Sequence, residues 1–150
     1  MHPSEIIKCL EKQGGNVSLG TQGIELNNAS KIDDSMKAML KENKRRLTLF
    51  LKGEYTDKKA KVDYINDKLL DYMVKHVVTN TDAIDNFLRS DEEAVELIMQ
   101  RALKLWNNGW RNYAEYPANY EDDTTDDLAD QIYTRVMQHT QKKQEEMRAC

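Results

Sequence analysis

Few of the features that identify a secreted or membrane protein occur in this 150-residue sequence. Its only two cysteines, Cys9 and Cys150, lie far apart and do not form the framework of a disulfide-stabilised secreted domain. No apolar run approaches the roughly 20 residues that a membrane-spanning helix requires. The first residues lack the basic start and apolar core of a signal peptide. We therefore expect a cytoplasmic protein without a membrane segment.

Motifs for catalysis and metal binding are also missing. The three histidines, His2, His76 and His139, are widely separated and lack the paired cysteine or Glu-x-x-His spacing of a zinc site. The sequence contains no glycine-rich phosphate loop, no nucleophile motif and no evident acid–base pair. These absences predict a non-enzymatic protein that uses no cofactor and binds no metal.

Charge is distributed unevenly along the chain, although the formal net charge is only -4. Residues 1–36 carry a net charge of -2, residues 37–75 a net charge of +5, and residues 76–150 a net charge of -7. A basic middle segment is therefore followed by an acidic end, and the two parts favour different partners.

The stretch from Gly14 to Leu26 predicts a β-hairpin, the only strand pattern in the sequence. Apolar and polar residues alternate in residues 17–19 and again in residues 24–26, which is the two-residue period of a strand. The intervening turn, residues 20–23, has a glycine at each end, as tight turns require. A lone hairpin is marginally stable in water, so we expect flanking helices to support it. Its open edges also offer backbone groups to a partner.

Helices are predicted on both sides of the hairpin. The first spans residues 4–13, with Ser4 as its N-cap, and the second spans residues 33–52 and ends at Gly53. On the second helix the apolar residues share one arc, namely Met36, Met39, Leu40, Leu47, Phe50 and Leu51. Most of the basic residues share a separate arc, namely Lys37, Lys41, Lys44, Arg45 and Lys52.

The spacing of these residues resembles that of the TubC N-terminal docking-domain family. The resemblance covers residues 1–53 and rests on Ile6, Ile7, Leu10, Gly15, Val17, Leu19, Gly23, Ile24, Leu26, Asn43, Lys44, Leu47 and Leu51. It implies a small α/β unit whose exposed hairpin takes up a partner segment in a multienzyme assembly line. It also implies a possible phage or mobile-element setting. We expect no synthase domain after the unit, which would be a departure from the assembly-line proteins.

Residues 57–150 predict an α-helical bundle, so the expected fold class is mainly α, with a small helix–hairpin–helix unit at the start. We expect helices over residues 57–78, around residues 84–88, and from a capping box at Ser90–Glu93 to Trp106. An aromatic loop over residues 107–123 then leads to a last helix. The core residues expected on that helix are Leu128, Ile132, Val136 and Met137, and a polar tail frays after it.

Two kinds of partner fit these patterns. The first is a protein segment that docks at the hairpin, for which the predicted contact residues are Ser18, Thr21, Gln22, Glu25, Lys41, Lys44 and Arg45. The alternative is that the hairpin's apolar residues only form a core.

The second partner is nucleic acid, bound by an accessory factor in replication or regulation. The residues predicted to contact nucleic acid, or a protein partner in its place, are Lys37 and Lys52 of the basic arc together with Lys58, Lys59, Trp110, Tyr113 and Tyr116. The alternatives are a solvated helix face and an aromatic loop packed on the bundle, with Trp106 in the core and Trp110 at the surface.

The acidic run from Glu121 to Asp130 contains six carboxylates in ten residues. We interpret it mainly as a helix start, where carboxylates are stabilised by the helix dipole. A cation site and a mimic of nucleic-acid phosphates are the other readings, although EF-hand spacing is absent. Together, these observations predict a docking or adaptor protein, with nucleic-acid binding as the competing hypothesis.

Overall fold

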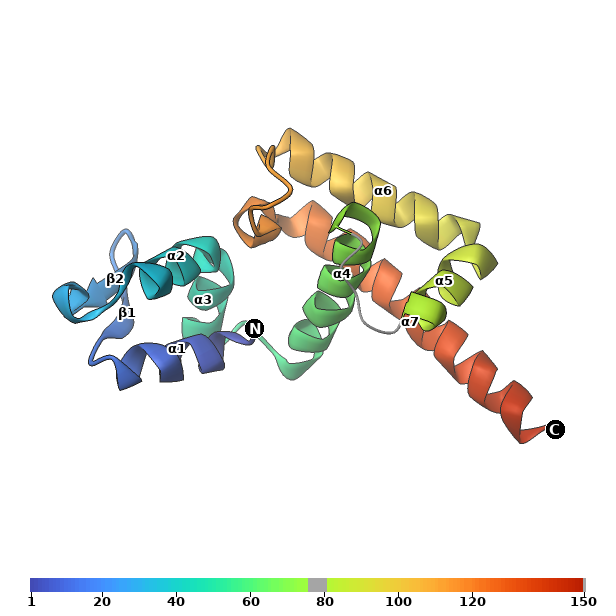
Figure 1. The fold of residues 1–150 in the computed structure, drawn as a ribbon, viewed down its shortest axis with the longest axis horizontal. Helices are drawn as coiled ribbons and strands as arrows, with labels where there is room; N and C mark the ends of the chain where they lie inside the picture. Colours follow the sequence, from blue (N-terminus) through green and yellow to red (C-terminus); the bar gives the residue numbers. More distant parts are fainter. Residues whose placement is uncertain (76–80, 150) are drawn as a thin grey trace. The chain divides into compact units, whose positions relative to one another are not determined.

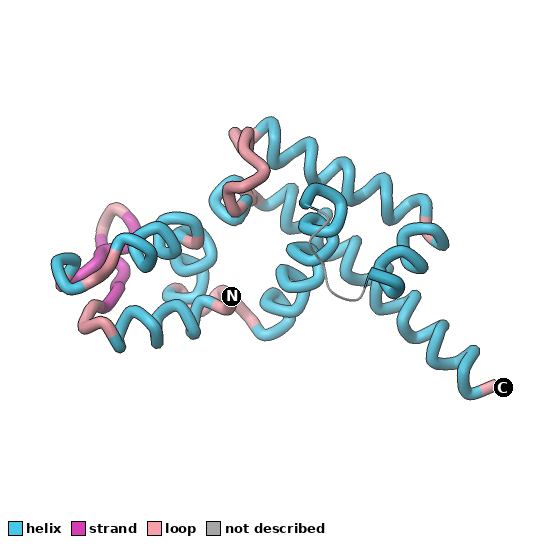
Figure 2. The backbone as a smooth tube through the Cα atoms, in the orientation of Figure 1, coloured by secondary structure: helices cyan, strands magenta, loops and turns pink. Residues whose placement is uncertain are grey.

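The computed structural model describes residues 1–75 and 81–149. The described residues form seven α-helices and one two-stranded antiparallel hairpin (Figures 1 and 2). The expected mainly α fold with a helix–hairpin–helix start is therefore confirmed. The position of His76, expected on a helix, lies outside the described residues.

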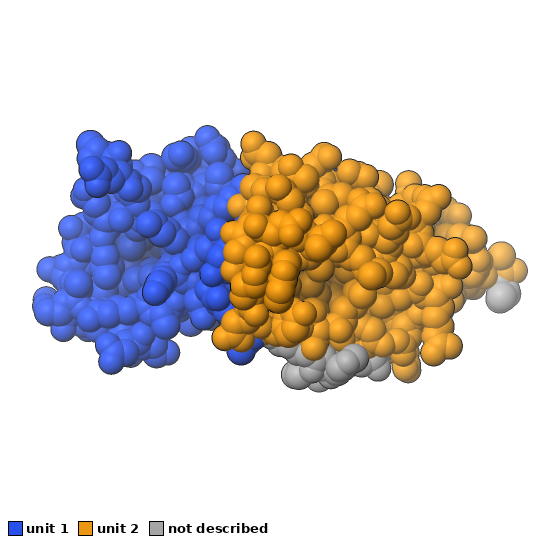
Figure 3. Space-filling view, turned by 90° about the horizontal axis from the view of Figure 1, so that it is seen from above, with its two compact units in different colours: residues 1–60, 114–120 blue, residues 61–113, 121–150 orange. Residues whose placement is uncertain are grey.

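The chain divides into two compact units (Figure 3). Unit 1 comprises residues 1–60 and 114–120, and unit 2 comprises residues 61–113 and 121–150. The predicted division into residues 1–53 and 57–150 did not include the return of residues 114–120 to the first unit. Local sequence patterns do not indicate contacts between residues that are so far apart in the chain.

Unit 1 begins with α1 (Pro3–Lys12), followed by β1 (Asn16–Gly20) and β2 (Gly23–Asn27). Val17 pairs with Leu26 and Leu19 pairs with Ile24, so the apolar residues of both strands share one face. Gly23 in the turn has a φ of 118°, which favours glycine. The first helix is capped by the side chain of His2, which accepts a hydrogen bond from the Ser4 amide at 3.0 Å, so the prediction of Ser4 as the cap was wrong.

The predicted single helix over residues 33–52 is in fact two helices, α2 (Asp34–Glu42) and α3 (Lys44–Leu51), with η1 (Ala29–Lys31) before them. The interruption lies at Asn43, which is buried and leaves helical backbone geometry at φ -110° and ψ 15°. Its side-chain amide donates to the Met39 carbonyl at 2.9 Å. Arg46, on the helix that follows the interruption, is only 2% exposed.

Arg46 holds residues 114–120 in unit 1. Its Nη1 donates to the Tyr116 hydroxyl at 2.5 Å, and its guanidinium carbon lies 5.1 Å from the centre of the Tyr116 ring. The short helix η2 (Pro117–Tyr120) follows, and Asn119 accepts a hydrogen bond from the Arg45 amide at 3.2 Å. The amide of the Asn119 side chain also donates to the Lys41 carbonyl. This part of the aromatic loop packs on α3, not on the helical bundle as expected.

Unit 2 is built mainly from α4 (Asp57–Lys75), α5 (Thr81–Ser90), α6 (Glu92–Asn107) and α7 (Asp123–Arg148). Its main apolar cluster contains Leu69, Phe87, Ala94, Ile98 and Ile132. A buried ion pair joins α6 to the start of α7, with Arg101 Nη2 3.2 Å from Glu121 Oε1. The last helix continues to Arg148, so the predicted fraying of the polar tail was wrong.

Aspartates cap the helices α6 and α7 of unit 2. Asp91 accepts a hydrogen bond from the Ala94 amide at 3.0 Å, whereas the Ser90 hydroxyl donates to the Phe87 carbonyl at 2.9 Å. The predicted cap at Ser90 was therefore one residue too early. Asp122 caps α7 by accepting from the Thr125 amide at 2.8 Å, which confirms the helix-start interpretation for this part of the acidic run.

Across residues 1–75 and 81–149, no helix combines the length and the apolar character needed to cross a membrane.

Replacing Tyr116 with Phe is expected to lower the free energy of unfolding of unit 1 by about 2 kcal/mol, because the buried Arg46 guanidinium loses a hydrogen-bond acceptor. Urea unfolding of the full chain measures this loss. Tyr113→Phe is the matched control, since Tyr113 is 54% exposed, and it should change the stability by less than about 0.5 kcal/mol. Equal effects of the two variants would contradict the role of Tyr116.

Stability should fall in acid as the two helix caps are protonated. The Thr125 amide is the main cause that lowers the pKa of Asp122, against an opposing effect of burial. For Asp91, burial raises the pKa, but hydrogen bonds from the Ala94 and Glu93 amides and from Arg135, with the positive charge of Arg135, together outweigh it and lower the pKa. Because these pKa values are lower in the folded state, the stabilisation is present above the unfolded value of about 3.9 and is lost as pH falls through the folded values.

Urea unfolding between about pH 6 and pH 2 tests this dependence. The variant Asp122→Asn should have a smaller loss of stability over that range than the parent protein. An identical pH dependence in the two proteins would show that Asp122 does not contribute.

Candidate functional site

A groove lies in unit 1 between the apolar face of the hairpin and the helices α2 and α3. It has a volume of about 170 Å³. The strands contribute Val17, Ile24 and Leu26, and the helices contribute Leu40 and Leu47. Leu47 is completely buried at the base, whereas the other four are only partly buried. The groove is thus an apolar surface that the unit's own core does not cover.

Three lysines line the same groove, namely Lys37, Lys41 and Lys44. Lys37 and Lys41 are one turn apart on α2, and Lys44 is the first residue of α3. All three are exposed. The groove therefore combines an apolar floor with a positively charged border.

The hairpin residues predicted to bind a partner lie elsewhere. Ser18 and Glu25 are paired across the strands, and the alternation of side chains directs them to the face opposite the groove. The Glu25 carboxyl group lies against Gly20 of the neighbouring strand. Thr21 and Gln22 are exposed in the turn. Of the predicted docking residues, only Lys41 and Lys44 line the groove.

The remaining basic candidates also belong to unit 1. Lys44, Arg45 and Lys52 line a second, more open hollow together with Thr48, Leu49 and Asn119. Lys58 is exposed in the first turn of α4. The Lys59 ammonium lies 5.8 Å from the centre of the Tyr55 ring. The predicted basic residues are thus split between the groove, the second hollow and the start of α4.

The two tryptophans have the opposite exposure to the one expected. Trp110 is 3% exposed and Trp106 is 38% exposed. Gly109 has a φ of 119° and ends α6 in a Schellman motif, in which the Trp110 amide donates to the Leu105 carbonyl at 3.0 Å. An apolar residue directly after such a glycine commonly packs against the helix end. The Gly109–Trp110 pair was the signal in the sequence that could have identified Trp110 as buried.

The other aromatic candidates are also engaged. The ring centres of Tyr113 and Trp110 are 5.5 Å apart in an edge-to-face arrangement, and Tyr113 is exposed. Tyr116 is held by Arg46 in unit 1. Buried or occupied rings are poor platforms for stacking bases, and of the predicted set Tyr113 alone is exposed, with its ring beside those of Trp106 and Trp110.

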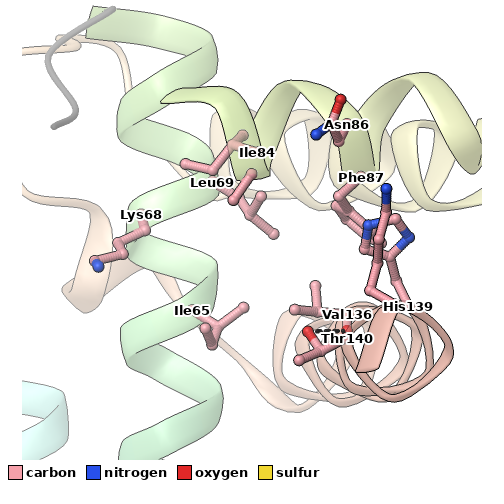
Figure 4. Close-up of a pocket in the computed structure, with 11 residues that line it drawn as sticks. Ile65, Lys68, Leu69, Ile84, Asn86, Phe87, Val136, His139 and Thr140 are labelled. Atoms are coloured by element: carbon pink, nitrogen blue, oxygen red, sulfur yellow. Dashed lines mark hydrogen bonds between the residues drawn. The ribbon is translucent and has the colours of Figure 1, made fainter. Parts of the chain in front are cut away.

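A larger pocket of about 390 Å³ lies in unit 2 between α4, α5 and α7 (Figure 4). Its apolar lining includes Ile65, Leu69, Ile84, Phe87 and Val136. The close-up view shows these side chains directed into the space between the three helices. No local sequence pattern indicates this pocket, because the residues that line it come from three separate helices.

His139 borders this pocket. Its ring lies edge-on to Phe87, with 5.5 Å between ring centres, and its Nδ1 is 3.2 Å from the Ser90 hydroxyl. The pocket suits an apolar group, and none of its described lining residues is an aspartate, glutamate or cysteine.

Within residues 1–75 and 81–149, no three or more side chains of histidine, cysteine, aspartate or glutamate gather in a way that could hold a metal ion. Two carboxylates of the acidic run have structural partners instead. Glu121 pairs with Arg101, and Asp122 also accepts a hydrogen bond from the Asn108 side chain at 2.8 Å.

Comparisons of the chain with protein-family models, with curated proteins and with solved structures give no match. The expectation of a TubC-like unit therefore stays a prediction based on the spacing of residues 6–51.

Leu40 and Leu47 should differ sharply in their contributions to stability. Leu47→Ala is expected to lower the free energy of unfolding by about 3 kcal/mol, because it opens a cavity in the core. Leu40→Ala should cost about 1 kcal/mol, since part of that side chain already contacts solvent. Urea unfolding distinguishes them, and equal costs would show that Leu40 belongs to the core and not to an open groove.

Proposed function

We propose that the protein is a docking or adaptor protein whose groove in unit 1 binds a segment of another protein. The observation that supports this function is the apolar floor formed by Val17, Ile24, Leu26 and Leu40 beside a row of lysines. Hydrophobic surface left open at the base of a groove favours an apolar anchor from a partner.

The chemistry of the groove indicates the type of segment. Apolar side chains would occupy the floor, and acidic residues next to them would meet Lys37, Lys41 and Lys44. An amphipathic helix provides both, with anchors every three or four residues. The charged border would increase the association rate, and the apolar contact would supply most of the affinity.

The TubC-like spacing leads to the same class of function, with a partner segment taken up beside the hairpin. A phage or mobile-element setting follows only from that resemblance and is part of the proposal. A non-enzymatic role for the chain is likewise proposed from its lack of catalytic motifs.

A pull-down with the tagged full-length protein, treated with nuclease, tests the proposal. Leu40→Glu places a negative charge on the groove floor and should reduce recovery of a specific protein partner at least tenfold. Lys41→Glu should also weaken binding, whereas Lys12→Glu, an exposed lysine on α1, is the matched control. Circular dichroism checks that each variant is folded.

Glu25→Lys separates the groove from the other face of the hairpin. Binding in the groove predicts no effect of this variant, because Glu25 faces away from it. Loss of the partner with Glu25→Lys but not with Leu40→Glu would contradict the proposed location.

Nucleic-acid binding is the second candidate, and one observation favours it. Lys44, Arg45 and Lys52 surround an open hollow to which Asn119 adds a polar side chain. Such a surface could follow a phosphate backbone. The predicted stacking by Trp110 and Tyr116 is not available to it, since the first ring is buried and the second contacts Arg46.

Fluorescence anisotropy with labelled single-stranded and duplex DNA tests this alternative. If nucleic acid is the ligand, affinity should fall steeply as salt rises, and Arg45→Glu with Lys52→Glu should abolish binding. Leu40→Glu should then have little effect beyond the added charge. No measurable DNA binding at low salt would exclude DNA as the ligand.

A further inference from the structure

The outward face of α6 carries a stripe of exposed apolar side chains. Met99, Leu103 and Trp106 are 59%, 60% and 38% exposed, and Val95 lies one turn before Met99. These four residues, here called the α6 stripe, follow spacings of four, four and three, so they lie along one side of the helix. Large apolar side chains grouped in this way mark an interaction surface more often than isolated ones do.

The α6 stripe is not the face that packs into unit 2. Ala94, Ile98, Arg101 and Leu105 form the buried face of the same helix. A helix with one apolar face turned inward needs no second apolar face for folding. The packing of unit 2 therefore does not require the apolar side chains of the stripe.

Charge along the stripe changes sign from one end to the other. At the beginning of the stripe, Glu92 and Glu96 lie beside Val95 and Met99. At its other end the Arg111 guanidinium lies 4.4 Å from the Trp106 ring. Lys104, the other cation near this end, is within 3.7 Å of Asp122.

We propose that the α6 stripe pairs antiparallel with the same stripe of a second copy of this chain. In that orientation Glu92 and Glu96 of each copy approach Arg111 of the other, whereas a parallel pair would place the glutamates together. Met99 and Leu103 would meet across the two-fold axis, with Val95 opposite Trp106. Two-fold dimers with a self-complementary surface are the commonest oligomers.

The contact is small. With a rise of about 1.5 Å per residue, the 16-residue helix α6 is about 24 Å long. A pair of single helices of this length buries less than a standard protein interface, which has about 800 Å² on each partner. The dimer should therefore dissociate on dilution and form at high concentration. This inference is independent of the proposed docking function, because α6 belongs to unit 2 and the groove to unit 1.

Analytical ultracentrifugation of the full-length protein over a wide concentration range is the test. The parent protein should shift from monomer to dimer, and Met99→Glu should raise the dissociation constant at least tenfold. Met147→Glu is the matched control, because Met147 is 77% exposed but lies on α7. A protein that stays monomeric throughout, or a dimer that Met99→Glu does not weaken, overturns the proposal.

Charge reversal tests the antiparallel orientation. Glu92→Arg alone and Arg111→Glu alone should each weaken the dimer, and the double variant should recover most of the lost affinity. Circular dichroism and the thermal midpoint confirm that the variants fold equally well. A double variant no better than the weaker single variant overturns the antiparallel pairing.

Discussion

The hairpin of unit 1 depends on helices that cover its single apolar face. Two strands alone bury too little surface to be stable. Ile6 and Leu10 of α1, Met36 of α2 and Leu47 of α3 form the core against which the strands pack. The helices do not cover the whole face, since Val17, Ile24 and Leu26 remain partly exposed beside Leu40. The same arrangement that stabilises the hairpin therefore leaves an apolar groove, and the helix that borders it supplies the lysines.

Unit 1 also includes residues 114–120, which come more than fifty residues after the rest of the unit in the sequence. Arg46 is buried on α3, and Tyr116 provides it with a hydrogen-bond acceptor and an aromatic neighbour. A buried guanidinium without such partners would be costly. Residues 1–53, the part that resembles a docking domain, would leave Arg46 without these contacts if isolated. Tests of the groove therefore require the full chain, because its bordering helix α3 depends on residues 114–120.

Local sequence patterns predicted the elements well and the contacts poorly. Alternation of Val17, Leu19, Ile24 and Leu26 gave the correct strands and the correct apolar face. The break at Asn43 was missed because the apolar period continues through it, whereas the burial of the Asn43 side chain is not visible in the local pattern. Of the candidate site, the three lysines Lys37, Lys41 and Lys44 were predicted from the basic arc. Leu40 was predicted to lie on the apolar side of its helix. Its partial exposure depends on how much of that side the hairpin covers, and no local sequence pattern shows this.

The most direct test of the central claim, that the groove binds an acidic amphipathic segment, is chemical-shift mapping by NMR. An isotope-labelled full-length protein would be titrated with a helical peptide that carries leucines on one face and glutamates beside them. The account predicts that shift changes concentrate at Val17, Ile24, Leu26 and Leu40, and that a peptide with its leucines replaced by serine produces none. Changes confined to Ser18, Gln22 and Glu25, or to the hollow beside Lys52, would contradict it.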